Sequence, residues 1–301
     1  MQNLVSISQK FNKTRIAPTP SGYLHLGNVL SFAVTAALGQ QTGANILLRI
    51  DDLDRTRANP QFIQDIFDTL NFLEITWDEG PRSVEEFEDV WSQVHRLDMY
   101  NQALQQLWDS GQVFACTCSR AQIDAAGTGG VYPGTCRNKH LPPNTPNAAW
   151  RLDTSLQKNL TIKTLAGEML ETALPDDMHH FIVRKKDGYP AYQLASVIDD
   201  LHFGVDLVVR GHDLWPSTLA QHYLASVLGT SPFENITFHH HPLLVQPNGN
   251  KLSKSAGATS VKFLRDEGRS TGYIYTQIAK MMNVNKQAQS FNELITIINE
   301  A

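Results

Sequence analysis

Short apolar runs alternate with longer helical patterns along the first fifty residues of the chain. Residues 14–17 predict a short strand, which the turn-forming cluster at 18–22 ends. The apolar run 28–40 is typical of a buried helix that stops at Gly43. A second apolar run, 45–50, predicts a strand that is buried on both faces. Strand, turn, helix and strand in this order form a βαβ unit, so we expect a parallel sheet.

The segment from Trp108 to Arg151 differs in character from the chain on either side of it. It contains all three cysteines, a cluster of glycines and the proline-rich stretch 141–146. We therefore predict an insertion with little regular structure.

The regular pattern resumes beyond this insertion. Strands are predicted at 181–186, 205–211 and 236–246, helices at 190–200 and 213–229, a turn at 248–250, and two or three short helices from Thr259 onward. The expected fold is α/β, with a doubly wound parallel sheet that the insertion interrupts. The expected parts are the first half of the main domain (1–107), the insertion (108–178), the second half (179–258) and a short helical C-terminal tail (259–301).

Composition and charge narrow the class of protein. Of the 301 residues, 42% are hydrophobic and 18% charged, which excludes a disordered chain. The chain has 25 Lys and Arg against 30 Asp and Glu, so it lacks the overall positive charge of a protein that coats nucleic acid non-specifically. A local basic groove is compatible with this composition. The chain shows neither a signal peptide nor an apolar run of membrane-spanning length. We expect a soluble cytoplasmic protein with no membrane contact and no obligate protein partner.

Two short motifs carry candidate phosphate chemistry, while the common glycine-rich nucleotide loops are absent from the sequence. His25 and Gly27 lie where the first strand meets the first helix, a position suited to an anion. Lys251 and Lys254, in the run KLSKS, can neutralise a phosphate chain. Either motif alone is usually a helix cap or a solvated surface. In this order within one α/β domain, they match the phosphate apparatus of class I aminoacyl-tRNA synthetases.

The surrounding sequence makes this resemblance specific. Residues 15–22, 25–28, 48–54, 192–200 and 209–214 resemble motifs of glutamyl-tRNA synthetases, and the likeness extends to about Ser255. The chain is most similar to the short subfamily of glutamyl-queuosine tRNA(Asp) synthetases. It ends soon after KLSKS, whereas full glutamyl-tRNA synthetases continue into a helical anticodon-binding region. The resemblance implies a class I, Rossmann-like fold with a zinc-binding insertion.

The resemblance also implies roles for individual residues. The implied catalytic residues are His25, Gly27, Lys251 and Lys254. The implied ATP-binding residues are His25, Gly27, Asn28 and Lys254. Glutamate binding falls to Arg15, Ala17, Thr19, Asp51, Tyr192 and Arg210. Four positions depart from the family: Asp51 replaces Glu, Thr19 replaces Ser, Asn28 replaces a second His, and Leu252 replaces Met. Asp51 is the consequential departure, because its shorter side chain implies a repacked pocket, a bridging water or altered amino-acid selectivity.

The insertion holds a candidate metal site. Cys116 and Cys118, followed by Cys136 in a glycine-rich loop, can form a tetrahedral thiolate site for one structural zinc. The resemblance implies Tyr132 as the fourth ligand, whereas His140 is the commoner zinc ligand on chemical grounds. Three thiols without metal are the alternative.

Two further runs, one of histidines and one of basic residues, could have a function, but we interpret both as structural. His239, His240 and His241 cannot all converge on a metal, because neighbouring strand residues point to opposite faces. The basic run 184–186 is typical of a solvated hairpin, although contact with RNA phosphates stays open.

The resemblance implies a ligase that activates glutamate with ATP and Mg²⁺ and transfers it to queuosine in the anticodon of tRNA(Asp). One alternative is a truncated glutamyl-tRNA synthetase that charges a tRNA 3′ end. The other is a synthetase-derived RNA-binding module without catalysis.

Overall fold

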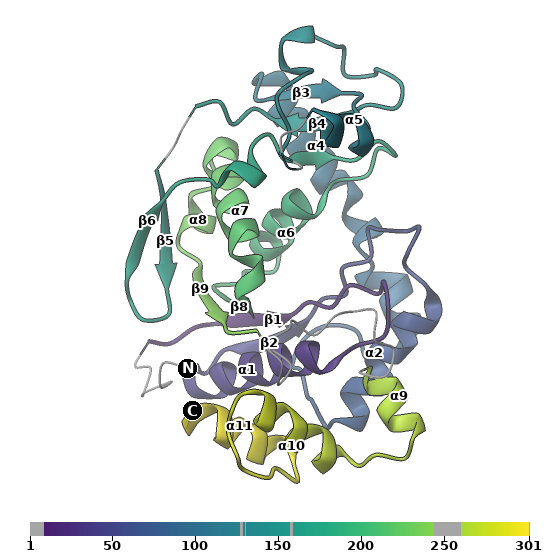
Figure 1. Ribbon diagram of the computed structural model, residues 1–301, viewed down its shortest axis with the longest axis vertical. Coiled ribbons are helices and arrows are strands. Elements are labelled where there is room, and N and C mark those ends of the chain that lie inside the picture. Colours follow the sequence, from purple (N-terminus) through teal and green to yellow (C-terminus); the bar gives the residue numbers. More distant parts are fainter. Residues whose placement is uncertain (1–8, 127–128, 130, 157–158, 244–259, 301) are drawn as a thin grey trace. The chain divides into compact units, whose positions relative to one another are not determined.

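The structure, a computed structural model, describes residues 9–126, 129, 131–156, 159–243 and 260–300. The chain forms two compact units (Figure 1). Unit 1 comprises residues 1–95, 205–213 and 239–301, and unit 2 comprises residues 96–204 and 214–238. No helix within the described ranges is long and apolar enough to cross a membrane.

Unit 1 begins with the predicted βαβ arrangement. Strand β1 (Lys13–Ile16) pairs in parallel with β2 (Asn45–Leu48), and α1 (Leu26–Thr42) connects them. Strand β8 (Leu207–Gly211) packs beside β1. The carboxylate of Asp206 reinforces this pairing, because it accepts hydrogen bonds from the backbone N–H groups that start β1. The predicted elements 14–17, 28–40, 45–50 and 205–211 are therefore confirmed to within a few residues.

Helix α1 is apolar around almost its whole circumference because other elements cover it on several sides. It packs against β1, β2 and β8, and against two helices of the C-terminal tail, α10 (Thr271–Met281) and α11 (Phe291–Glu300). A third short helix, α9 (Val261–Asp266), precedes them and confirms the predicted helical tail. Unit 1 also contains α2 (Pro60–Phe72) and α3 (Val84–Glu86).

Unit 2 contains an antiparallel sheet that the sequence analysis missed. Strands β3 (Val113–Cys116), β4 (Ala149–Leu152) and β7 (Ile182–Arg184) pair in the order β3-β4-β7. Two of these strands belong to the segment predicted to have little regular structure, which is therefore corrected. All four residues of β4 are buried, so packing on both sides stabilises a strand too short to show a clear pattern in sequence.

Helices complete unit 2 together with a second sheet. The helices are α4 (Leu97–Asp109), α5 (Arg120–Ala125), α6 (Tyr192–His202), α7 (Trp215–Leu228) and α8 (Ser231–Glu234). Strands β5 (Leu160–Thr164) and β6 (Met169–Thr172) form an antiparallel hairpin, and β5 also pairs in parallel with the start of β9 (Thr237–His241). The α/β class is confirmed with mixed sheets. A single doubly wound parallel sheet stays a prediction, as do the four predicted divisions of the chain.

A buried ion pair joins two helices of unit 2. The guanidinium of Arg96, just before α4, donates to both carboxylate oxygens of Asp199 on α6, at 2.8 and 3.2 Å. The hydroxyl of Tyr100 donates to the same carboxylate at 2.6 Å. Burial raises the pKa of Tyr100, and the neighbouring carboxylate raises it further. Each polar group here has a partner, which is the condition under which buried charge is tolerated.

The variant Asp199→Asn removes the charge that compensates Arg96. We expect it to lower the free energy of unfolding by ~3 kcal/mol, because a buried cation is left without its anion. Urea denaturation followed by circular dichroism measures this loss. Asp98→Asn on the exposed face of α4 is the matched control and should lose less than ~1 kcal/mol. Equal losses in the two variants would contradict the interpretation.

Candidate functional site

His25 caps the start of α1 through its own ring. Its Nδ1 atom accepts the backbone N–H of Gly27 at 3.1 Å, and the side-chain oxygen of Asn28 accepts the backbone N–H of His25 at 3.0 Å. Because Nδ1 accepts, a neutral ring carries its proton on Nε2, the donor that a phosphate oxygen requires. Capping and phosphate binding are therefore compatible roles of one imidazole.

Gly27 and Asn28 contribute to this arrangement in ways that the sequence analysis did not assign. A Cβ atom at Gly27 would lie 3.0 Å from the imidazole Cε1 of His25, so a larger residue there would push the ring from this position. Asn28 uses its oxygen to close the reciprocal capping box. Both residues thus orient His25, and direct contact of either one with ATP stays a prediction.

The loop that carries Lys251 and Lys254 lies outside the described residues. The described chain resumes at Ser260, which forms an isolated antiparallel bridge with His25. The backbone N–H of Val261 donates to the carbonyl of Leu24 at 2.8 Å. The described chain that follows the KLSKS run is therefore anchored, at Ser260 and Val261, beside the His25 motif.

Five of the six predicted glutamate-binding residues belong to unit 1. Arg15 is buried on β1 and donates to the carbonyl of Val209 on β8 at 3.3 Å, and the buried Arg210 follows on β8. Past the end of β1, the carbonyl of Pro18 accepts the backbone N–H of Asp51 at 2.9 Å. The other two, Ala17 and Thr19, are the chain neighbours of Pro18. The structure thus brings these residues to the adjacent ends of β1, β2 and β8.

The sixth residue, Tyr192, belongs to unit 2. It is the first residue of α6, and its side chain is 42% exposed.

Arg49 is a polar partner in this region that the sequence analysis missed. Its guanidinium donates to both carboxylate oxygens of Asp51, at 2.7 and 3.1 Å, and both side chains are buried. The substrate ammonium would therefore meet a carboxylate that an arginine already holds. The R-x-D spacing was the available signal, because residues two apart on an extended chain face the same side. The ammonium-binding role of Asp51 stays a prediction.

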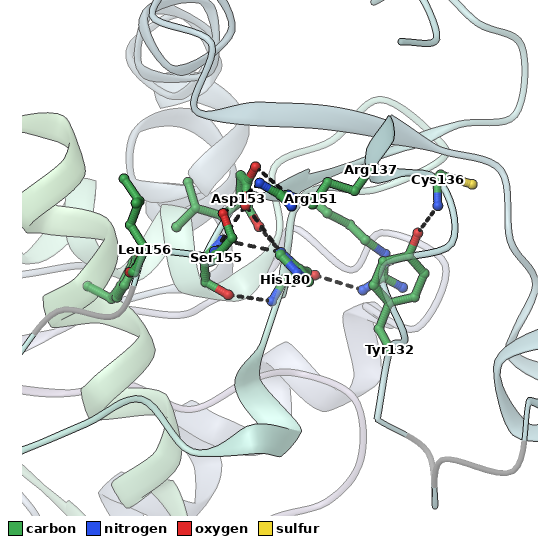
Figure 2. A network of polar contacts seen from close by, with 11 residues as sticks. Tyr132, Cys136, Arg137, Arg151, Asp153, Ser155, Leu156 and His180 are labelled. Carbon is green, nitrogen blue, oxygen red and sulfur yellow. Dashed lines mark hydrogen bonds and ion pairs between the residues drawn. The ribbon is translucent and has the colours of Figure 1, made fainter. Parts of the chain in front are cut away.

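Three cysteine thiols converge in unit 2. The Sγ atoms of Cys116, Cys118 and Cys136 all lie within 4.8 Å of one another. Cys116 ends β3, and Cys136 precedes a short helical turn, 137–139. The hydroxyl of Tyr132 lies 3.3 Å from the sulfur of Cys116. The same hydroxyl accepts the backbone N–H of Cys136 at 2.8 Å (Figure 2).

Three sulfur atoms and one phenol oxygen are thus gathered in one small volume, a donor set that suits a tetrahedral thiophilic cation. Among the described residues, this is the group of metal-ligating side chains close enough to hold an ion, and His140 is not a member of it. The geometry favours Tyr132 over His140 as the fourth donor.

Charge within this cluster is unevenly distributed. Burial and the neighbouring thiols raise the pKa of Cys118 to about 11. Burial opposes ionisation of Cys136 as well, but hydrogen bonds from the backbone of Thr117 and from Cys118 and Tyr132 outweigh it and lower the pKa to about 7. Cys136 therefore becomes a thiolate, the form that binds a metal, more readily than Cys118 does.

The contacts around the cluster connect it to strand β4. Arg137, next to Cys136, donates from Nε to the carboxylate of Asp153 at 2.7 Å. The backbone N–H of Thr154 donates to the ring of His180 at 3.2 Å, and the ring of His180 meets that of Tyr132 edge to face (Figure 2). Hydrogen bonds and ring packing thus connect the cysteine-bearing loop to the residues that directly follow β4.

The three consecutive histidines lie in or beside the core. Burial lowers the pKa of His239 to about 4 and that of His240 to about 2, so both are neutral near pH 7. The Nε2 atom of His241 lies 3.0 Å from the hydroxyl oxygen of Ser31 on α1, within hydrogen-bond distance. These contacts agree with the structural interpretation of this run.

The basic run 184–186, which starts at the last residue of β7, makes local contacts. Arg184 lies over the ring of Trp150 at 4.8 Å, and Lys185 pairs with Asp187 at 3.0 Å. Lys186 donates to the carbonyl of Thr117, between two of the cysteines, at 2.9 Å. Contact of this run with RNA phosphates stays a prediction.

Comparison with known proteins gives the family. Residues 12–129 and 153–301 match the family described as tRNA synthetases class I (E and Q), catalytic domain. The glutamyl-Q tRNA(Asp) synthetase of Pseudomonas aeruginosa strain LESB58 is 37% identical over 241 residues, which are 80% of this chain and 76% of that protein. The protein of the same name from Symbiobacterium thermophilum is 34% identical over 301 residues, covering 95% of this chain and 92% of that one.

A solved structure gives the same fold. The glutamate tRNA ligase of Elizabethkingia meningosepticum, in complex with its amino acid, superimposes with a TM-score of 0.75 at 23% identity. The match covers 97% of this chain, which spans 66% of that longer protein. The family match and the relatives agree with each other and with this fold, and the chain belongs to the class I tRNA synthetases of the E and Q type.

Proposed function

We propose that this chain activates glutamate with ATP and transfers it to queuosine in the anticodon of tRNA(Asp). The observation that carries the proposal is the 34% identity to a glutamyl-Q tRNA(Asp) synthetase along almost the whole length of both chains. Because its substrates are ATP and tRNA, we also propose that it acts in the cytoplasm.

In the first step, ATP binds beside the start of α1. The Nε2–H of His25 and the amide groups of the helix start donate to phosphate oxygens, with Mg²⁺ on the nucleotide. Lys254, supported by Lys251, stabilises the charge that develops on pyrophosphate. The bridge between Ser260 and His25 supports this assignment, because the chain that follows the lysine run starts beside the His25 motif.

Glutamate is held by charge complementarity. Arg15 and Arg210 bind its carboxylates, because a guanidinium matches a carboxylate in shape and charge. Asp51 and Tyr192 orient the ammonium, and Ala17 and Thr19 border the same pocket. An oxygen of the α-carboxylate attacks the α-phosphorus in line and pyrophosphate leaves, which gives glutamyl-adenylate. Positioning and charge stabilisation supply the rate, without a covalent enzyme intermediate.

In the second step, a hydroxyl of the queuosine cyclopentene ring attacks the carbonyl of glutamyl-adenylate and AMP leaves. The modified base enters the active site from the anticodon loop, as unstacked bases do in many RNA-binding sites.

Zinc is proposed as a structural ion, one per chain, held by Cys116, Cys118, Cys136 and Tyr132. When bound, it cross-links a loop that has little apolar core of its own. The convergence of four donor atoms supports this assignment.

The phosphate chemistry is tested with Lys254→Ala. We expect ATP–pyrophosphate exchange with glutamate, measured without tRNA, to fall ~10²-fold or more, because the lysine acts mainly on the transition state. Lys262→Ala is the matched control, since this half-buried lysine pairs with Asp266 on α9 and should leave exchange unchanged. Near-normal exchange in Lys254→Ala would end the assignment, and no exchange in the wild type would favour the non-catalytic RNA-binding module.

The metal site is tested by elemental analysis of freshly purified protein. We expect about one zinc per chain, lost in Cys116→Ser because a thiolate ligand is removed. The variants Tyr132→Phe and His140→Ala identify the fourth ligand: the first should weaken zinc binding and the second should leave it unchanged. The reverse result would assign the ligand to His140, and a zinc-free wild type would refute the site.

The acceptor is tested with radiolabelled glutamate. We expect labelling of tRNA(Asp) from cells that make queuosine and none of tRNA from queuosine-deficient cells, because the accepting hydroxyl belongs to the modified base. Each tRNA sample is assayed twice, once with its 3′-terminal adenosine intact and once after this adenosine has been removed enzymatically. Labelling should survive that removal. Labelling of tRNA(Glu) that disappears with its terminal adenosine would instead identify a glutamyl-tRNA synthetase, the activity named in the 33% identical relative from Myxococcus xanthus.

A further inference from the structure

The ring of Tyr132 packs against two residues of the neighbouring sheet. Phe114 on β3 stacks against it with ring centroids 6.2 Å apart. The guanidinium of Arg151 lies over the ring, 3.8 Å from its centroid. Arg151 belongs to β4, the central strand of the sheet, and is the register partner of Phe114. The aromatic ring that presents an oxygen to the cysteines is thus fixed by a cation on a rigid strand.

The charge of Arg151 has unusual surroundings. Arg151 is only 8% exposed. One terminal N–H donates to the carbonyl of His180 at 2.9 Å, and Nε has no hydrogen-bond partner. Within the described part of the chain, no carboxylate lies within salt-bridge distance of it. A buried guanidinium stays charged, so its burial requires a nearby negative charge or strong polar contacts.

The buried Arg96 of the same unit shows the usual solution. Its guanidinium is paired with both oxygens of Asp199. For Arg151, the proposed metal site would supply a negative charge at the other end of Tyr132, whose hydroxyl lies beside the sulfur of Cys116. Three thiolates around a divalent cation leave at least one net negative charge, which the stacked guanidinium would offset through the ring.

We propose that Arg151 is a positioning residue of the metal centre, which holds the oxygen of Tyr132 toward the cysteines and compensates the negative charge of the thiolate-bound ion. This inference rests on the metal binding proposed above. It assigns a role to a residue that lies outside the two stretches matched by the family, 12–129 and 153–301.

The test separates charge from packing with two variants. Arg151→Gln removes the charge but retains an N–H donor for the carbonyl of His180, and Arg151→Lys retains the charge. Arg184→Gln is the matched control, because Arg184 stacks on Trp150 at 4.8 Å in the same sheet but contacts no proposed ligand. Zn²⁺ affinity is measured by competition with a chromophoric chelator, and Co²⁺ substitution reports the ligand field by visible absorption.

We expect Arg151→Gln to bind Zn²⁺ about 10- to 100-fold more weakly, the range for loss of a residue that supports a metal ligand. Its Co²⁺ bands should also shift, because the phenol oxygen is no longer held in place. Arg151→Lys and Arg184→Gln should stay within about 3-fold of wild-type affinity, with wild-type Co²⁺ spectra. In the Tyr132→Phe background, Arg151→Gln should add less than a further 3-fold, since the oxygen that it positions is already gone.

Wild-type affinity and an unchanged Co²⁺ spectrum in Arg151→Gln would overturn the role of Arg151 while leaving the metal site and the ligase activity intact. If Arg151→Gln does not fold, Arg151→Lys decides, because a tenfold or greater loss in this charged variant contradicts charge compensation. A wild type that binds no Zn²⁺ overturns the inference together with the metal site. ATP–pyrophosphate exchange, measured separately, shows whether the proposed ligase activity stands in that case.

Discussion

Parallel pairing between β1 and β2 is the constraint on which the candidate site of unit 1 depends. The pairing continues past the regular strands, because the carbonyls of Ile16 and Pro18 accept the N–H groups of Arg49 and Asp51. Parallel strands end at the same edge, so Arg15, Asp51 and the start of α1 are brought to one side of the unit. The phosphates of ATP and the carboxylates of glutamate, which we propose bind here, require arginine side chains and helix amides close together. The register of β1 and β2 places these groups at one edge.

Compensation of buried charge organises unit 2 in a similar way. Arg96 is neutralised by Asp199, and the pair fixes α4 against α6. Arg151 is equally buried but meets an aromatic ring and a backbone carbonyl instead of an acid. Arg151 therefore lacks the acidic partner that Arg96 has. The negative charge proposed at the metal would compensate the buried guanidinium of Arg151 instead.

The cysteine-bearing segment also illustrates how a small loop obtains stability. Its core is a cluster of Phe114, Cys116, Tyr132 and Cys136, with few apolar residues around it. So small a core does little to offset the conformational entropy of a glycine-rich loop, and the metal proposed for the three cysteines would stabilise the loop by restricting the chain. Strand β3 and the preceding α4 then hold this loop in a fixed place within the unit.

The sequence by itself determined the elements that depend on local patterns. The βαβ opening, the capping of α1 by His25, the helices α6 and α7 and the three-cysteine cluster all follow from residues close together in the chain, because periodicity, turn chemistry and ligand spacing are local signals. It also carried the family resemblance that the comparisons confirm.

Tertiary structure alone decided the features that join distant or weakly patterned segments. Strands β3 and β4 lie at the ends of a segment whose cysteines, glycines and prolines indicate irregular structure, yet their pairing places Arg151 on the ring of Tyr132. The position of the Tyr132 hydroxyl beside the cysteines likewise depends on how the loop folds back, since Tyr132 and His140 are both near Cys136 in sequence. Such contacts are invisible in sequence because they arise from the packing of surfaces that form only when the chain has folded.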